Sequence, residues 1–256
     1  MKIRLFCVAG FLVAGLTAAG PALAGCDDPG ALGVSRTISV DTSHPLMVGH
    51  LQYRGSLGLE PGEVALTFDD GPYPGRTDKI LDALDAACVK ATFFVVGEMA
   101  RAHPDLVRRE DADGQTIGTH SWSHPLSLAA LPYAAGSAEI DHGIAAVTAV
   151  LGHAPAPFFR FPGFGDDRAL RAKVVGEGLG IFSTDVVGND WITMSRDTVR
   201  ETVLRGLKAH NGGIVMLHDI KKATAAMLPE LLKDIKAAGY RIVALTPASG
   251  PLAATF

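Results

Sequence analysis

Two aspartates and two histidines have the residue types and spacing of a metal site. His120 and His124 are four residues apart, and in a helical turn that spacing places both imidazoles on one face. An HxxxH pair alone is a weak signal, because it often occurs by coincidence. Asp69 and Asp70 directly follow an apolar run, where two unpaired anions are costly unless a cation compensates them. One of these aspartates could instead order the Gly-Pro turn that follows.

One aspartate with two histidines gives three protein ligands and leaves a fourth position for water. That arrangement is typical of catalytic zinc sites, whereas structural sites more often use cysteines. The sequence therefore favours a catalytic metal over a structural one.

Further residues that could bind or react follow other apolar runs along the chain. They are Arg160, Gly163, Asp185, Asp190, Trp191 and His218. In α/β barrels the working residues gather at the C-terminal ends of the strands, so we expect these side chains on one rim. Taken singly, Arg160 could pair with Asp166 or Asp167 at the surface, and His218 could cap its strand. Trp122 and Trp191 could line a sugar-binding groove or belong to the core.

Apolar runs of strand length alternate with stretches of helical spacing. The predicted strands are residues 64–68, 91–96, 116–119, 158–161, 180–184, 214–217 and 241–245. The predicted helices are residues 77–87, 137–151, 168–177, 195–210 and 223–238. This alternation predicts an α/β fold with parallel strands buried on both faces. Seven strands fit a closed or nearly closed barrel, and an open doubly wound sheet remains the alternative.

The first residues differ from the rest of the chain. In residues 1–24, two basic residues precede an apolar run and a small-residue cleavage site, which predicts a signal peptide and a secreted or periplasmic mature chain. The run is shorter than the roughly 20 residues of a membrane span, so we expect no integral membrane segment in the mature chain. Residues 25–61 are interpreted as an N-terminal extension with a strand-like stretch at 37–40, and residues 62–256 as the main domain.

Cysteine count and charge limit the remaining possibilities. Removing the signal leaves Cys26 and Cys88, an even pair for which we expect a disulfide in an oxidising compartment. Residues 23–26 also resemble a lipoprotein box that would lipidate Cys26, and two unpaired thiols are the third possibility. A hydrophobic content of 48% excludes a disordered chain, while a net charge of −4 without a basic cluster argues against nucleic acid as a partner.

From about residue 63 to about residue 245 the chain resembles the NodB-type polysaccharide deacetylases, carbohydrate esterase family 4. The resemblance is carried by two unchanged motifs, Thr67-Phe68-Asp69-Asp70-Gly71-Pro72 and His120-Ser121-x-x-His124. It implies the NodB homology fold, a distorted barrel of about seven parallel strands, over residues 62–256. It also implies a divalent metal held by Asp70, His120 and His124, usually Zn²⁺, with Co²⁺ or Ni²⁺ as alternatives.

The resemblance further implies catalytic roles. Asp69 is expected to act as general base on the metal-bound water that attacks the acetyl carbonyl, with Arg160 keeping Asp69 ionised. His218 is expected to protonate the leaving amine, with Asp190 tuning its proton affinity and Asp185 competing for that pairing.

Four residues are expected to meet the substrate. The backbone N–H of Gly163 would bind the oxyanion, and Tyr73 and Trp191 are candidate contacts. Met216 stands where a leucine usually lines the acetyl pocket. The chain has Phe-Pro-Gly at 161–163 where many members have Pro-Pro-Tyr, so the tyrosine side chain is absent.

The predicted function is removal of N-acetyl groups from an N-acetylglucosamine-containing polysaccharide, such as a chitooligosaccharide or peptidoglycan. An O-acetyl esterase acting on xylan or another glycan would use the same machinery. A non-catalytic carbohydrate-binding protein that kept the fold is the third hypothesis.

Overall fold

The strands of this chain form one parallel sheet. The computed structural model describes residues 30–193 and 195–248, and the sheet within them has ten strands. The strands are β1 (Arg36–Val40), β2 (Met47–Val48), β3 (Glu63–Asp69), β4 (Thr92–Val95), β5 (Thr116–Thr119), β6 (Phe158–Phe159), β7 (Gly180–Phe182), β8 (Val186–Val187), β9 (Gly213–His218) and β10 (Arg241–Pro247). Their pairings are parallel, as the alternation of strand and helix predicts.

The paired strands form a closed circuit that begins and ends at β3. β3 pairs with β4 and with β9, and β4 is followed in order by β5, β6 and β7. Residues 180–187 complete the circuit, because β7 pairs with β6 while β8 pairs with β9. Between these two short strands, the Asp185 N–H donates to the Ile214 carbonyl at 2.9 Å. A distorted barrel requires such a circuit, whereas an open doubly wound sheet does not have one.

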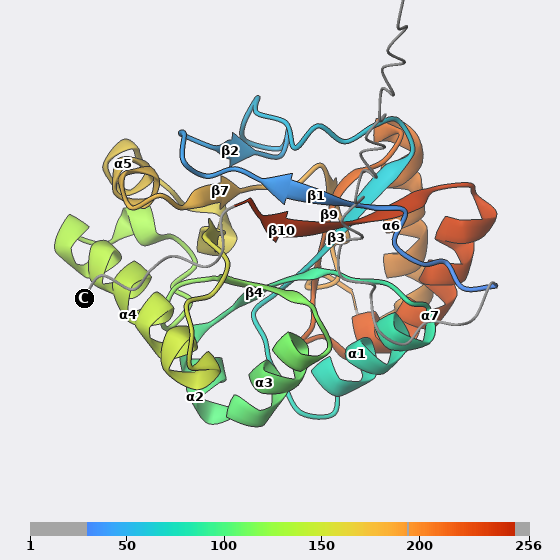
Figure 1. The fold of residues 1–256 in the computed structure, drawn as a ribbon, viewed down its shortest axis with the longest axis horizontal. Helices are drawn as coiled ribbons and strands as arrows, with labels where there is room; N and C mark the ends of the chain where they lie inside the picture. Colours follow the sequence, from blue (N-terminus) through green and yellow to red (C-terminus); the bar gives the residue numbers. More distant parts are fainter. Residues whose placement is uncertain (1–29, 194, 249–256) are drawn as a thin grey trace, which may run out of the picture.

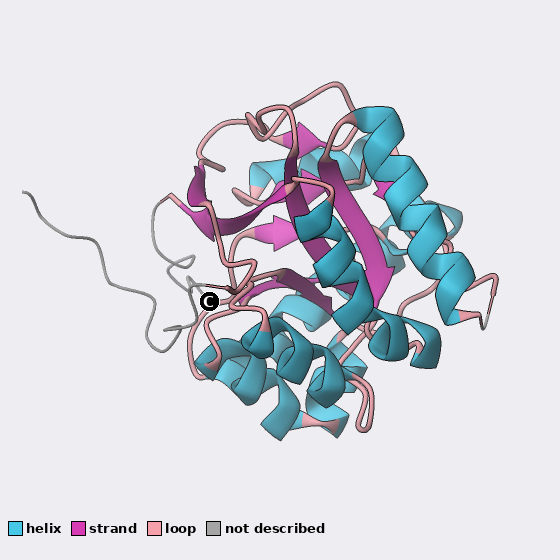
Figure 2. Cartoon of the chain, turned by 90° about the vertical axis from the view of Figure 1, so that its right-hand side faces the viewer, coloured by secondary structure: helices cyan, strands magenta, loops and turns pink. Residues whose placement is uncertain are grey.

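Helices surround most of this ring. They are α1 (Thr77–Ala86), α2 (Gly97–Ala102), α3 (Pro104–Ala112), α4 (Tyr133–Leu151), α5 (Arg168–Gly176), α6 (Arg196–His210) and α7 (Lys222–Ala237), with 3₁₀ turns η1 (Leu128–Ala130) and η2 (Pro162–Phe164). Figure 1 shows them in an arc from α5 through α4, α3 and α1 to α7 and α6, and neighbours in this arc pack together. Figure 2, from the right-hand side of that view, shows helices in front of the strands.

The segment before β3 lies along the same sheet. β1 pairs with β10, and β2 pairs with β7. In Figure 1 both strands cross the top of the molecule, where the arc of helices is open. The predicted domain boundary at residue 62 falls directly before β3, and the predicted signal peptide and Cys26 lie outside the described residues. Within the described ranges, no helix is long and apolar enough to cross a membrane.

The alternation of side chains along β3 decides which residues reach the interior of the ring. Val64, Leu66 and Phe68 pack in the hydrophobic cluster between the sheet and the helices. Ala65 packs in a second cluster, with Phe94 and Phe182. Successive strand residues point to opposite faces, so Thr67 and Asp69 share the interior face of Ala65. The side chain of Asp69, at the C-terminal end of β3, therefore points into the ring.

All seven predicted strands occur; β5 has the predicted bounds, and the other six differ at one end or both. The predicted strand at 158–161 is reduced to the two residues of β6, because the chain turns into η2 at Pro162. The sequence did not predict α2 and α3. They are short, and the Pro104 that begins α3 interrupts the helical pattern.

Candidate metal and catalytic site

Asp69 is the last residue of β3 and Asp70 begins the loop that follows, and a third aspartate, Asp219, packs against this loop. Asp70 has φ 78°, in the left-handed region, so its side chain leaves the strand in a different direction from Asp69. A Cβ at Gly71 would overlap the carboxylate of Asp219, so only glycine fits there. Asp219 is fully buried, its N–H donates to the Asp69 carbonyl at 3.2 Å, and its Oδ2 accepts from Thr77 Oγ1 at 2.6 Å. Sequence reasoning missed this support, because no local pattern links Gly71 to Asp219.

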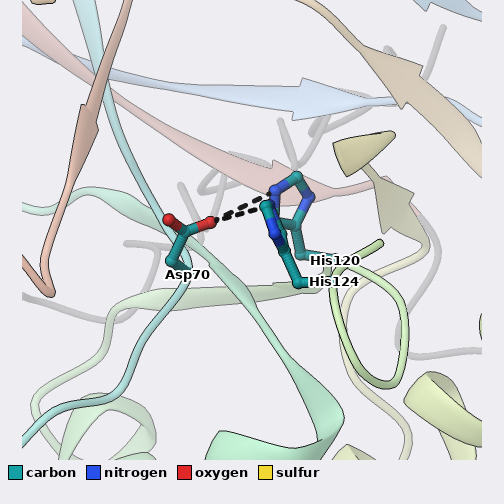
Figure 3. A group of neighbouring side chains, drawn as sticks. All are labelled: Asp70, His120 and His124. Carbon is teal, nitrogen blue, oxygen red and sulfur yellow. Dashed lines mark ion pairs between the residues drawn. The ribbon is translucent and has the colours of Figure 1, made fainter. Parts of the chain in front are cut away.

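Asp70, His120 and His124 form a group that could hold a metal ion. Their ligand atoms all lie within 4.8 Å of one another. Nε2 of His124 lies 3.1 Å from Oδ1 of Asp70, and Nε2 of His120 lies 3.5 Å from the same oxygen (Figure 3). That oxygen is buried, and no donor among the described residues makes a hydrogen bond of acceptable geometry to it. An orphaned carboxylate oxygen facing two imidazole nitrogens fits a divalent cation.

The two histidines come from a loop and not from a helical turn, so that part of the prediction is wrong. Residues 120–125 contain no helix, and Ser121 and His124 have φ 64° and φ 56°. The loop is tied to α4 by Glu139, whose carboxylate accepts from the N–H groups of Trp122 at 3.1 Å and Ser123 at 2.8 Å. Backbone folding, and not helical periodicity, therefore brings the imidazoles together, with ring centroids 4.9 Å apart. The sequence gives no signal for Glu139.

The tautomer of His120 is set by a second contact. Its Nδ1 lies 2.6 Å from the carbonyl oxygen of Arg160, so Nδ1–H donates and Nε2 keeps its lone pair toward Asp70. Burial lowers the pKa of His120 to about 4 against the opposing effect of Asp69 and Asp70, so the ring is neutral, as a ligand must be. Burial alone would raise the pKa of Asp70, but the rings of His124, His120 and His218 hold it well below its ordinary value.

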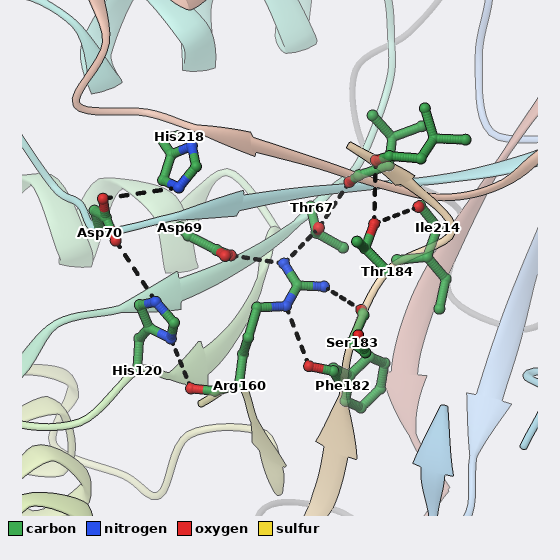
Figure 4. Close-up of polar contacts among 12 residues, drawn as sticks. Thr67, Asp69, Asp70, His120, Arg160, Phe182, Ser183, Thr184, Ile214 and His218 are labelled. Atoms are coloured by element: carbon green, nitrogen blue, oxygen red, sulfur yellow. Dashed lines mark hydrogen bonds and ion pairs between the residues drawn. The ribbon is translucent and has the colours of Figure 1, made fainter. Parts of the chain in front are cut away.

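Asp69 forms a fully buried ion pair with Arg160. Nη1 of Arg160 lies 2.7 Å from Oδ1 of Asp69 and donates to Thr67 Oγ1 at 2.8 Å (Figure 4). Nη2 donates to the Ser183 carbonyl at 2.8 Å, and Cζ lies 4.2 Å above the Phe94 ring. Because the guanidinium is hydrogen-bonded on several sides, it holds the carboxylate of Asp69 in one place.

Asp166 and Asp167, the two residues with which Arg160 could have paired at the surface, have other partners. Asp166 pairs with Arg171 and Tyr53. Asp167 caps α5 by accepting from the Leu170 N–H at 2.8 Å. The hydrogen bonds and the ion pair that Arg160 forms within the described residues involve neither of them.

His218 at the end of β9 pairs with Asp190. Its Nδ1 lies 2.7 Å from Oδ1 of Asp190, whose Oδ2 also accepts from the His218 N–H at 2.7 Å and from Thr224 Oγ1 at 2.6 Å. Nε2 therefore faces the site, 3.9 Å from Oδ2 of Asp70. Asp185 does not compete for this position, since it contacts His50 Nδ1 at 2.7 Å and the Ile214 N–H at 2.7 Å.

These groups meet in one cavity of about 480 Å³. It is lined by Asp69, Asp70, His120, His124 and His218, together with Leu126, Phe161, Gly163, Phe164, Trp191, Met216 and Lys221. The structure therefore brings the predicted metal, base and acid residues together, along with Gly163, Trp191 and Met216. The rings of Trp191 and His218 meet edge to face, 5.3 Å apart. Sequence reasoning did not single out Leu126, Phe164 or Lys221.

Two residues that the sequence singled out, Tyr73 and Cys88, lie outside this cavity. Tyr73 does not line the cavity: the residue is 40% exposed, and its ring packs against Arg76, whose Cζ lies 4.2 Å from the ring centroid. Cys88, shortly after α1, is disulfide-bonded. Its predicted partner Cys26 lies outside the described residues, so the Cys26–Cys88 pairing stays a prediction.

Comparison with known proteins gives matches over most of the described chain. A family model described as polysaccharide deacetylase matches residues 58–178. The peptidoglycan-N-acetylglucosamine deacetylase PgdA of Listeria monocytogenes is 38% identical over 183 residues, which are 71% of this chain and 38% of that protein. The chitin deacetylase of Colletotrichum lindemuthianum is 34% identical over 196 residues, covering 72% of this chain and 78% of that protein.

A solved structure has the same fold. A peptidoglycan deacetylase of Bdellovibrio bacteriovorus superposes with a TM-score of 0.76 at 35% identity, over 84% of this chain and 59% of that one. The chain thus spans 38% of the length of PgdA and 59% of the Bdellovibrio chain.

Proposed function

The chain belongs to the polysaccharide deacetylase family, and from that premise we propose that it is a metal-dependent hydrolase that removes N-acetyl groups from an N-acetylglucosamine-containing glycan. Chitooligosaccharides and peptidoglycan are the proposed substrates, since similar proteins are named for acting on chitin and on peptidoglycan. One observation carries the proposal. A carboxylate held by arginine, an imidazole held by aspartate and an Asp-His-His group line the same cavity.

Asp70, His120 and His124 would hold the metal. One carboxylate and two imidazoles suit Zn²⁺, which we propose as the ion, and Co²⁺ or Ni²⁺ would accept the same donors. When bound, such an ion polarises the acetyl oxygen and lowers the pKa of water.

The protein's own groups would move the protons. Asp69 accepts the proton of the attacking water, and the Arg160 contact holds its carboxylate in place for that step. His218 donates from Nε2 to the sugar nitrogen as the acetyl C–N bond breaks, since its Nδ1 is occupied by Asp190. The products are acetate and a free amine on the sugar. Gly163 and Met216 line the space proposed for the acetyl group, and Trp191 lines its wall.

We also propose that the mature chain acts in the periplasm or outside the cell. The signal-like pattern of residues 1–24 supports this proposal. A disulfide at Cys88 also fits an oxidising compartment.

Acetate release from purified protein supplied with Zn²⁺ tests the proposed substrate class. We expect release from chitooligosaccharides or peptidoglycan to exceed release from acetylated xylan. Preferential release from xylan would favour the O-acetyl esterase. No release from any of the three by protein shown to contain metal would favour a carbohydrate-binding protein.

A further inference from the structure

One cation lines the catalytic cavity and takes no part in the chemistry described above. Lys221 is partly buried and lines the same cavity as Asp69, Asp70 and His218. Its backbone N–H donates to the His218 carbonyl at 3.2 Å. The backbone of Lys221 is thereby held beside the imidazole proposed as the general acid.

Among the residues that the structure describes, no anion is paired with Lys221. Across residues 30–193 and 195–248, its ammonium takes part in no ion pair and no side-chain hydrogen bond. The carboxylates of the cavity have other partners, because Asp69 pairs with Arg160 at 2.7 Å and Asp70 lies 3.1 Å from Nε2 of His124. The positive charge of Lys221 is therefore available to a ligand in the cavity.

Helix stability does not explain a lysine at this position. Lys221 precedes α7 as its N-cap residue, makes no side-chain capping bond, and is followed by Lys222. The first turn of α7 has no acidic residue. Cations near a helix N-terminus are disfavoured by the helix dipole, and residues that break such local rules are often found at functional sites.

We propose that Lys221 determines specificity by binding an anionic substituent, in the first place a carboxylate, carried by the glycan beside the acetamido group that is removed. This inference rests on the proposed function and narrows its substrate class. A neutral chitooligosaccharide has no group to match this cation. A charge-assisted hydrogen bond from the ammonium to a carboxylate becomes stronger as the bound glycan displaces water from the cavity.

The test uses two substrates that differ at one group, which is charged in the first and neutral in the second. Peptide-free glycan strands of peptidoglycan are prepared with their lactyl carboxylates either free or converted to methylamides. Acetate release gives kcat/KM for each, and the ratio of the two values measures the preference for the charge. Effects of a variant on folding or on the chemistry cancel in this ratio.

We expect the unaltered chain to prefer the free carboxylate. Lys221→Met should lower the ratio about tenfold, as expected for loss of a hydrogen bond to a charged group, and Lys221→Arg should keep most of it. Lys222→Met is the matched control, because Lys222 is exposed and does not line the cavity. That variant should leave the ratio unchanged.

A salt titration of the unaltered chain tests the inference without any variant, since raised ionic strength should lower the ratio. A ratio near one in the unaltered chain, or the same ratio in Lys221→Met, would overturn the role of Lys221 and leave the proposed function standing. No acetate release from either substrate, with release from a chitooligosaccharide, would overturn this inference alone. No release from any of the three in the presence of Zn²⁺ would overturn the proposed function, and this inference with it.

Discussion

Nδ1 of His218 lies 2.7 Å from Oδ1 of Asp190, and the second oxygen of that carboxylate accepts the backbone N–H of the same histidine. One aspartate therefore fixes both the ring and the backbone of the residue proposed as the general acid. Burial alone would lower the pKa of His218, but Asp190, with help from Asp70 and Asp69, raises it to about 9.

Asp190→Asn removes the carboxylate that contributes most to that increase. The pKa of His218 falls, so the protonated donor is lost at a lower pH. We expect kcat to fall about 100-fold at pH 8 and the alkaline limit of activity to move to lower pH. The pH profile of acetate release checks this, with Asp185→Asn as the control because Asp185 contacts His50 instead. An unshifted alkaline limit in Asp190→Asn would contradict the pairing role.

Asp69→Asn distinguishes the role of a general base from the role of a metal ligand. The change removes a proton acceptor and leaves Asp70, His120 and His124 in place. We expect turnover to fall about 10²- to 10⁴-fold while the protein keeps its Zn²⁺. Acetate release and metal content are measured together, and Asp105→Asn, at an exposed carboxylate, serves as the control. Retained turnover would contradict the base assignment.

Arg160→Met tests how much the buried ion pair between Arg160 and Asp69 contributes to the free energy of unfolding. Asp69 and Arg160 are both fully buried, so the variant leaves an unpaired carboxylate in the interior. We expect the free energy of unfolding in urea to fall by about 3–5 kcal/mol. Adding Asp69→Asn should recover part of that loss without restoring activity, because no uncompensated charge then remains. A double variant whose loss equals the sum of the two single losses would show that the residues are not coupled.

Glu110 in α3 gives a prediction about pH and stability. It is fully buried, and neither carboxylate oxygen has a hydrogen-bond partner among the described residues. Burial, with a smaller contribution from Asp219, raises the pKa of Glu110 well above its usual value. The folded chain therefore holds this proton more tightly than the unfolded chain. The stability present below about pH 4.3, the ordinary pKa of glutamate, is lost as pH rises toward the folded-state pKa.

Glu110→Gln should reduce the loss of folding stability that occurs as the pH rises. We expect the variant to unfold with a free energy higher than that of the unaltered chain at pH 8, by about 1 kcal/mol or more. Urea unfolding between pH 5 and pH 8 checks the slope. Glu98→Gln, at an exposed position in α2, is the control and should keep the original slope. An unchanged slope in Glu110→Gln would show that Glu110 does not cause it.

The strands and the principal site residues could be predicted because their signals are local. The apolar run of β3 and the two aspartates that follow it are adjacent in sequence, and strand alternation places Asp69 on the interior face. The order of strands and helices predicts parallel pairing. The same local signals place His218 at the C-terminal end of its strand.

Features that depend on distant contacts could not be predicted. Glu139 holds the histidine loop from α4, and Asp219 lies beneath Gly71, yet no periodicity connects either pair. Closure of the ring depends on how residues 180–187 change partners from β6 to β9. Tyr73 follows the first motif directly but packs on Arg76 and does not line the cavity.

The most direct test of the central claim measures acetate release and bound metal on the same protein, first stripped with a chelator and then supplied with Zn²⁺. We predict that stripping abolishes release from the preferred glycan and that one Zn²⁺ per chain restores it. A protein shown to be free of metal that still releases acetate at the original rate would contradict the account.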